Sequence, residues 1–128
     1  MIIVQKWSDV NHLYLFHESG FYWYNRAMTL HNKLVRDKIP EYLDSKEIPY
    51  RLHIADKEEY WMKLKEKLAE EVIEFQKDES IDELADLLEV IDAVKKYKNI
   101  SDAEIAEVKS KKFADRGGFD KRIILEES

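Results

Sequence analysis

From Asp56 onward the apolar residues recur every three or four positions, which is the spacing that places side chains on one face of a helix. This first helical segment runs to about Lys77, and Asp56 with Glu59 has the capping-box spacing that starts a helix. Projected at about 100° per residue, its apolar positions form one stripe: Trp61, Leu64, Leu68, Val72 and Phe75. The pattern therefore predicts a long amphipathic helix over residues 56–77.

The same start signal occurs twice more. Ser80 with Glu83 opens a second helix that ends near Lys98, and Ser101 with Glu104 opens a third that stops at Gly117 and Gly118. A broad apolar face is predicted for the second helix: Leu84, Leu87, Leu88, Ile91 and Val94. Because the connections are short, the helices are expected to pack antiparallel in a mainly α bundle.

The chain before Asp56 has a different character. Residues 1–27 are rich in aromatic and β-branched residues, and HLYLFH and FYWYNR flank Ser19-Gly20, which predicts a small β-hairpin. We therefore expect an N-terminal extension over residues 1–27 and a helical domain over residues 28–128. Within the latter, Asp37 as a cap and Pro40 in the first turn predict a short helix, and YRLHI at 50–54 alternates like a short strand.

Composition narrows the class of protein. The chain has 128 residues, of which 45% are hydrophobic, a formal net charge of −6 and no cysteine. A net negative charge argues against nucleic acid as a partner, and the lack of cysteine excludes disulfides and thiolate zinc sites. No apolar run approaches the length of a membrane span, and no secretory signal begins the chain. These features are typical of a cytoplasmic protein with no membrane partner.

Two acid pairs interrupt the apolar faces. Glu71 and Glu74 lie beside the stripe of the first long helix, and Glu83 and Asp86 lie beside that of the second. Antiparallel packing would bring all four together, and carboxylates that close need a compensating cation. Since the set contains only carboxylate oxygens, Mg²⁺ or Mn²⁺ fits better than zinc or iron. A second interpretation stays open, because a chain that is 38% charged contains many such pairs by chance and Glu83 is also the capping partner of Ser80.

Three blocks in this order resemble a known family. They are NKLVRDKIPE (32–41), the EExxE of 70–74 followed by ELADLLEVI (83–91), and RGGFDKRIIL (116–125). Together they are similar to small MazG-like nucleotide pyrophosphohydrolases, which belong to the all-α NTP pyrophosphatase superfamily and are often labelled phosphoribosyl-ATP pyrophosphohydrolase-like. The resemblance covers about residues 29–125. Residues 1–27 have no counterpart in it, and the gap from Glu74 to Glu83 is shorter than in many relatives.

The resemblance implies an antiparallel helical bundle that assembles as a homodimer or homotetramer. It implies a magnesium-dependent enzyme that cleaves a nucleoside triphosphate, as NTP or dNTP, to the monophosphate and pyrophosphate in nucleotide-pool house-cleaning. Carried over by position, the metal ligands and catalytic acids are the four that the helical projection selects: Glu71, Glu74, Glu83 and Asp86. Glu74 is the acid that we assign to orienting or deprotonating the attacking water. Glu70 belongs to the motif but projects away from the others.

Cations concentrate at two places in this acidic chain, which is the arrangement expected of phosphate clamps. The predicted phosphate ligands lie within the first and last blocks of the resemblance: Lys33, Arg36, Arg116, Lys121 and Arg122. For the neighbouring Lys111 and Lys112, favourable charge near a helix C-terminus is the simpler explanation. The base-binding residues are not identified, although Trp61 and Phe119 offer stacking surfaces.

Two other functions remain open at this point. One is a phosphoribosyl-ATP pyrophosphohydrolase of histidine biosynthesis, which uses the same chemistry on another substrate. The other is a non-catalytic helical dimerisation or adaptor module, in which the acids are surface charge.

Overall fold

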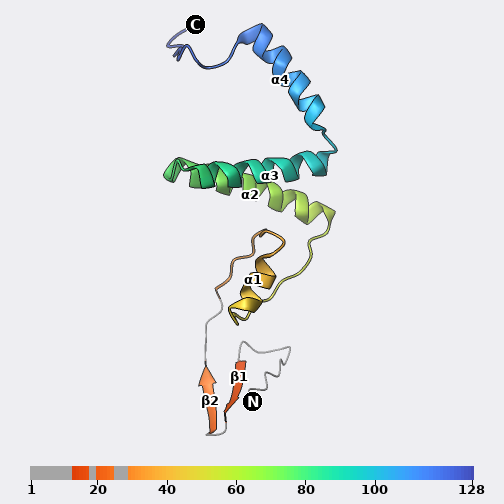
Figure 1. Cartoon of the computed structure of the whole chain (residues 1–128), viewed down its shortest axis with the longest axis vertical. Helices are drawn as coiled ribbons and strands as arrows, with labels where there is room; N and C mark the ends of the chain where they lie inside the picture. The colour runs from red at the N-terminus through yellow and green to blue at the C-terminus, as the bar shows by residue number, and fades with distance from the viewer. Residues whose placement is uncertain (1–12, 18–19, 25–28) are drawn as a thin grey trace. The chain divides into compact units, whose positions relative to one another are not determined.

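The computed structural model describes residues 13–17, 20–24 and 29–128, and in these the chain is mainly helical (Figure 1). Contacts divide the chain into two units, Met1–Ile54 and Ala55–Ser128. The first contains strands β1 and β2 and helix α1, and the second contains helices α2, α3 and α4. The domain boundary predicted between residues 27 and 28 lies outside the described residues and stays a prediction.

In the first unit, strands β1 (Leu13–His17) and β2 (Gly20–Tyr24) pair antiparallel, with Phe16 opposite Phe21. The turn predicted at Ser19-Gly20 falls partly outside the described residues. Segment 50–54, which alternates like a strand, forms no regular element. The prediction of a strand there is wrong, because an extended segment needs a neighbouring strand to satisfy its backbone groups and the described part of the chain gives it none.

Helix α1 spans Ile39–Ser45 and has Pro40 in its first turn, as the sequence predicts. Its N-cap is Lys38, which makes no side-chain capping bond, so the prediction of Asp37 as the cap is wrong. Proline has a φ that already suits the first helical turn and lacks only an N–H that would have no helical partner there. The start of α1 is therefore set by Pro40 and not by a side-chain cap.

Helix α2 (Lys57–Lys77) and helix α3 (Ile81–Lys98) begin where their caps are. The Asp56 carboxylate accepts the backbone N–H of Glu59 at 2.9 Å, and the Ser80 hydroxyl accepts that of Glu83 at 3.3 Å. Helix α3 is followed by its C-cap Asn99, which takes a left-handed conformation with a φ of 54°. Each of these side-chain caps satisfies one of the N–H groups that a helix start leaves without a partner.

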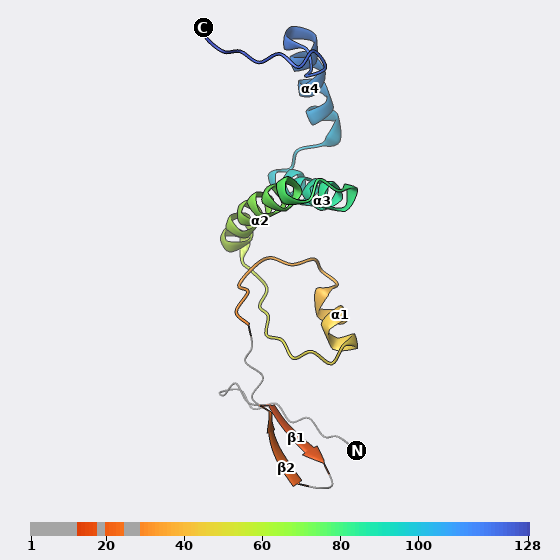
Figure 2. The same ribbon diagram turned by 90° about the vertical axis from the view of Figure 1, so that its left-hand side faces the viewer.

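Helices α2 and α3 pack antiparallel and lie side by side in both views (Figures 1 and 2). Leu64 from α2 and Val90 from α3 are the buried apolar side chains of the described chain, at 1% and 9% exposure. At one end of the pair, the Trp61 and Tyr97 rings stack with their centroids 4.7 Å apart. The Tyr97 hydroxyl also donates to the backbone carbonyl of Lys57 at 3.4 Å.

The apolar faces are only partly covered. Within the described residues Val72 is exposed on α2, and so are three members of the face predicted for α3: Leu84, Leu88 and Ile91. The prediction that these four side chains lie in a core is therefore not met within one chain. Two helices can bury only the strip along which they touch, so a wider apolar face stays open without a further layer.

Helix α4 spans Asp102–Arg116 and begins with the full capping box that the sequence predicts. The Ser101 hydroxyl accepts the N–H of Glu104 at 3.2 Å, and the Glu104 carboxylate accepts the N–H of Ser101 at 2.7 Å. The C-cap after Arg116 is Gly117, whose φ is 77°. An ion pair of 2.6 Å between Lys95 of α3 and Asp102 joins the two helices, and no regular element follows Gly117.

Candidate metal centre

The centre of the candidate site is Glu71 on the inner face of α2. Its exposure is 7%, and it is the buried charged residue of the described chain. The Lys67 ammonium pairs with its Oε1 at 2.7 Å, one helical turn earlier on the same helix. Burial of a carboxylate is costly unless it is paired or coordinates a metal, so a buried glutamate at this position requires cationic compensation.

Two further acids come from α3. One carboxylate oxygen each from Glu71, Glu83 and Asp86 lies within 4.8 Å of the other two, and Glu83 and Asp86 are half-buried. The Ser80 cap sets the start of α3, and the spacing of three residues then places Glu83 and Asp86 on the same side of that helix. We refer to Glu71, Glu83 and Asp86 as the acidic cluster.

Within the acidic cluster, the surroundings of Glu83 oppose its ionisation. Desolvation raises the pKa of Glu83, and the negative charges of Asp86, Glu71, Glu74 and Asp78 raise it further. A positive ion among these oxygens would oppose both effects by favouring the ionised carboxylate. The set contains oxygen donors only, which is the chemistry that Mg²⁺, Mn²⁺ and Ca²⁺ prefer.

Glu74 stands outside the acidic cluster. Its Oε1 pairs with Lys77 at 3.1 Å, and its side chain lines an open hollow along α2. Its charge nevertheless contributes to the raised pKa of Glu83, so it lies close enough to interact with the cluster electrostatically. Three of the four acids predicted as metal ligands are thus brought together, and the fourth lies beside them.

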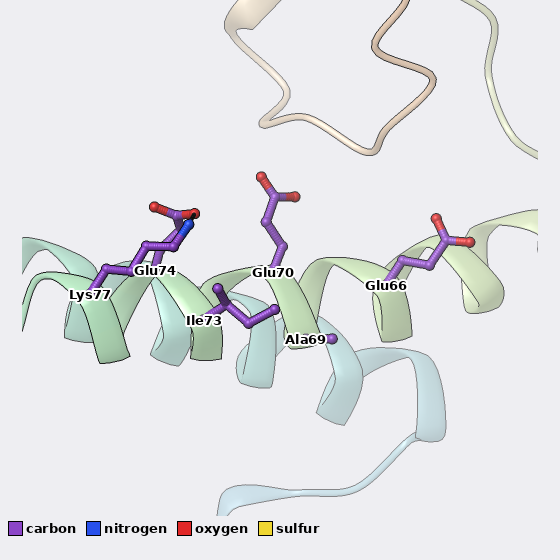
Figure 3. A pocket seen from close by; sticks show the side chains of 6 residues that line it. All are labelled: Glu66, Ala69, Glu70, Ile73, Glu74 and Lys77. Carbon is purple, nitrogen blue, oxygen red and sulfur yellow. Dashed lines mark hydrogen bonds and ion pairs between the residues drawn. The ribbon is translucent and has the colours of Figure 1, made fainter.

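The open hollow lies on the outer face of α2, the side away from α3, and is lined by both apolar and charged side chains (Figure 3). Figure 3 shows Glu66, Glu70 and Glu74 projecting to the same side of the helix. Six residues, all from α2, line the hollow: Glu66, Ala69, Glu70, Ile73, Glu74 and Lys77. Glu70 lines this hollow and is not a member of the acidic cluster.

Lys67 is a site residue that sequence reasoning missed. Its Nζ lies 2.7 Å from Glu71 and 3.2 Å from Glu70. Burial lowers the pKa of Lys67, but the hydrogen bonds to Glu71 and Glu70 outweigh burial, and the pKa is raised. The signal was available, because a lysine three or four residues from a glutamate on one helix is placed to pair with it.

The five predicted phosphate ligands have separate settings. Lys33 and Arg36 are exposed residues of the first unit, whereas Arg116, Lys121 and Arg122 are exposed residues of the second. Arg116 pairs with Asp115 at 3.4 Å, and Arg122 has a φ of 54°. Their assignment to phosphate stays a prediction.

The two aromatic candidates for base stacking also differ. One face of the Trp61 ring is taken by Tyr97, with interplanar angle 4°, while the ammonium groups of Lys65 and Lys98 lie 5.5 and 5.4 Å from its centroid. This favours a packing role for Trp61. Phe119 is 97% exposed.

Among the described helices, none combines the length and apolar character that a membrane crossing needs. Comparison of the chain with protein-family models, curated proteins and solved structures gives no match. The resemblance to MazG-like pyrophosphohydrolases therefore stays a prediction from the three sequence blocks, and the middle block contains the three residues of the acidic cluster.

Proposed function

We propose that this protein is a magnesium-dependent nucleoside triphosphate pyrophosphohydrolase that converts NTP or dNTP to the monophosphate and pyrophosphate, in the cleaning of the nucleotide pool. The observation that carries the proposal is the convergence of Glu71 with Glu83 and Asp86 from a second helix, with oxygens within 4.8 Å. These are three of the four positions at which the family resemblance calls for metal ligands. Helical periodicity selects the same positions without reference to any family.

The donor set suits a hard divalent cation. Glu71, Glu83 and Asp86 would hold Mg²⁺, or Mn²⁺, through carboxylate oxygens, and the cluster has no histidine or cysteine that would favour zinc. Bound Mg²⁺ supplies charge neutralisation for a triphosphate and acidifies a bound water. Its affinity for phosphate oxygens is what connects an all-carboxylate site to a nucleotide substrate.

The remaining acid has a separate task in this proposal. Glu74 lies outside the cluster but its charge reaches Glu83, so it would lie beside the ion that the cluster holds. We assign Glu74 to accepting the proton of the attacking water. The predicted cations bind the phosphate groups: Lys33, Arg36, Arg116, Lys121 and Arg122.

The exposed apolar face of α3 supports assembly as part of the same proposal. Leu84, Leu88 and Ile91 form a stripe that the described chain leaves open. Stripes of this kind on helices mark contact surfaces. A second copy of the chain would cover this stripe in a homodimer or homotetramer. Sedimentation equilibrium tests this assembly. Leu88→Lys should give a monomer, and a variant that assembles like the wild type would contradict the proposed contact.

The same apolar face also favours a second candidate function, a non-catalytic dimerisation or adaptor module. In that case the acidic cluster would be surface charge without a ligand. Measurements of stability alone separate the two functions poorly, because relief of carboxylate repulsion is expected in both. Activity separates them.

The test is pyrophosphate release from a panel of standard and altered NTPs and dNTPs, with phosphoribosyl-ATP included, in Mg²⁺ and in chelator. The proposal expects Mg²⁺-dependent release from nucleoside triphosphates. A preference for phosphoribosyl-ATP would instead assign the chain to histidine biosynthesis. No turnover by folded protein, together with no Mg²⁺-induced rise in melting temperature, would favour the adaptor module.

A further inference from the structure

Lys67 joins the two faces of α2. Its ammonium lies 2.7 Å from Glu71 Oε1 on the inner face and 3.2 Å from Glu70 Oε2 on the outer face. The Lys67 side chain is 19% exposed, against 9% for the side chain of Glu71 and 34% for that of Glu70. Lys67 therefore has a buried partner, Glu71, in the acidic cluster and a second, more exposed partner, Glu70, outside it.

We infer that Lys67 is a built-in counter-ion that exchanges with the metal ion at Glu71. This inference rests on the proposed function, because it concerns how the same site takes up its cation. In the metal-free protein Lys67 neutralises the buried Glu71. When a divalent cation enters the acidic cluster, Lys67 leaves Glu71 and keeps its pair with Glu70.

The exchange follows from distance and charge. A carboxylate oxygen that accepts a charge-assisted bond of 2.7 Å from Lys67 must give up much of that bond to bind a divalent cation at about 2.1 Å. An ammonium and a divalent cation held against one carboxylate also repel each other strongly in a partly buried setting. Glu70 lowers the cost of release, because it offers Lys67 a second carboxylate within reach.

This role explains two features together. It gives a purpose to Glu70, which lines the open hollow and is not a member of the acidic cluster. It also accounts for a buried glutamate that is compensated before any metal arrives. Lys67 thus stabilises the metal-free fold and weakens metal binding, and these two effects have opposite signs in a variant that lacks the ammonium.

The test is calorimetric titration of the full chain with MnCl₂ alone, beside melting in chelator. Lys67→Met keeps an unbranched side chain of similar length and removes the charge. We expect it to melt at a lower temperature in chelator but to bind Mn²⁺ about three- to fivefold more tightly than the wild type, which is the fold-change for an ion pair near the upper end of the usual range. Lys67→Arg, which keeps the positive charge, should bind Mn²⁺ like the wild type.

Lys63 supplies a matched control. It also lies on α2 and pairs with a glutamate at 2.7 Å, but that partner, Glu66, is exposed and outside the acidic cluster. Lys63→Met should leave Mn²⁺ affinity unchanged. Mn²⁺ binding by the wild type that is equal or weaker in Lys67→Met would overturn the role of Lys67 alone. No Mn²⁺ binding by the wild type or any variant would overturn the proposed metal site and this role with it.

Discussion

The two faces of α2 carry the same kind of side chain in different settings. On the inner face Glu71 is buried, faces Glu83 and Asp86 of α3, and pairs with a half-buried lysine. On the outer face Glu66 is exposed along an open hollow and pairs with Lys63 of its own helix. The difference arises because only the inner face meets a second helix that brings acids of its own. Acids along α2 alone therefore do not define the candidate metal site. The acids that α3 places beside Glu71 define it.

The largest expected effect on activity comes from replacing one glutamate on each face of α2 with glutamine. Glu71→Gln removes a proposed ligand and should lower Mg²⁺-dependent pyrophosphate release about a thousandfold, because stabilisation of charge in the transition state depends on the cation. Glu66→Gln, on the same helix and outside the cluster, should keep near wild-type activity. Equal losses in the two variants would show that the two faces do not differ in function.

A buried leucine and an exposed leucine compare the covered and the open apolar surface of the α2–α3 pair. Leu64 is 1% exposed between α2 and α3, whereas Leu88 is 53% exposed on α3. Leu64→Ala should cost about 2–5 kcal/mol in the free energy of unfolding, measured with urea at low protein concentration. Leu88→Ala should cost much less under those conditions, and more at concentrations where a second copy covers it. A cost for Leu88→Ala that matches Leu64→Ala at every concentration would contradict this comparison.

A smaller effect on metal binding should distinguish the cap of α3 from the cap of α4. Ser80 caps α3, which carries two acids of the cluster, and Ser101 caps α4, which carries none. Loss of either cap should cost about 1 kcal/mol of helix stability, measured by chemical unfolding. Only Ser80→Ala should also weaken Mn²⁺ binding, because Ser80 sets the position of Glu83. Weakened Mn²⁺ binding in Ser101→Ala would show that α4 contributes to the site.

The smallest effect, on melting temperature, tests whether burial and neighbouring negative charges oppose ionisation of Glu83. Glu83 has a raised pKa, so its ionisation costs the folded protein more than it costs the unfolded chain. Glu83→Gln should therefore raise the melting temperature slightly in chelator at pH 7. The gain should shrink as the pH falls through the raised pKa, because the wild-type carboxyl then becomes neutral as well. A gain that grows on acidification would contradict the direction of the shift.

The helices that carry the site could be predicted because their starts are encoded locally. Asp56, Ser80 and Ser101 each cap a helix at the predicted place, since one side-chain oxygen and one nearby N–H suffice. The convergence of Glu71 with Glu83 and Asp86 followed from the same periodicity plus a short connection. A cap involves residues only three positions apart, so it can be predicted without knowledge of the tertiary contacts.

Other features depend on partners that a linear pattern does not contain. Val72 and Leu88 lie on predicted apolar faces but stay exposed, because two helices cover only their line of contact. The segment 50–54 has the alternation of a strand but no neighbouring strand among the described residues. Lys67 was not predicted, because a projection of apolar and acidic positions does not include the lysine that pairs with Glu71 one turn away on the same helix.

The most direct test of the metal site is an anomalous difference map from crystals of the full chain grown with MnCl₂. The proposed function predicts a manganese peak bounded by carboxylate oxygens of Glu71, Glu83 and Asp86, with Lys67 moved off Glu71. A peak in the outer hollow beside Glu66 and Glu70, or no peak in crystals soaked at high MnCl₂ concentration, would contradict it.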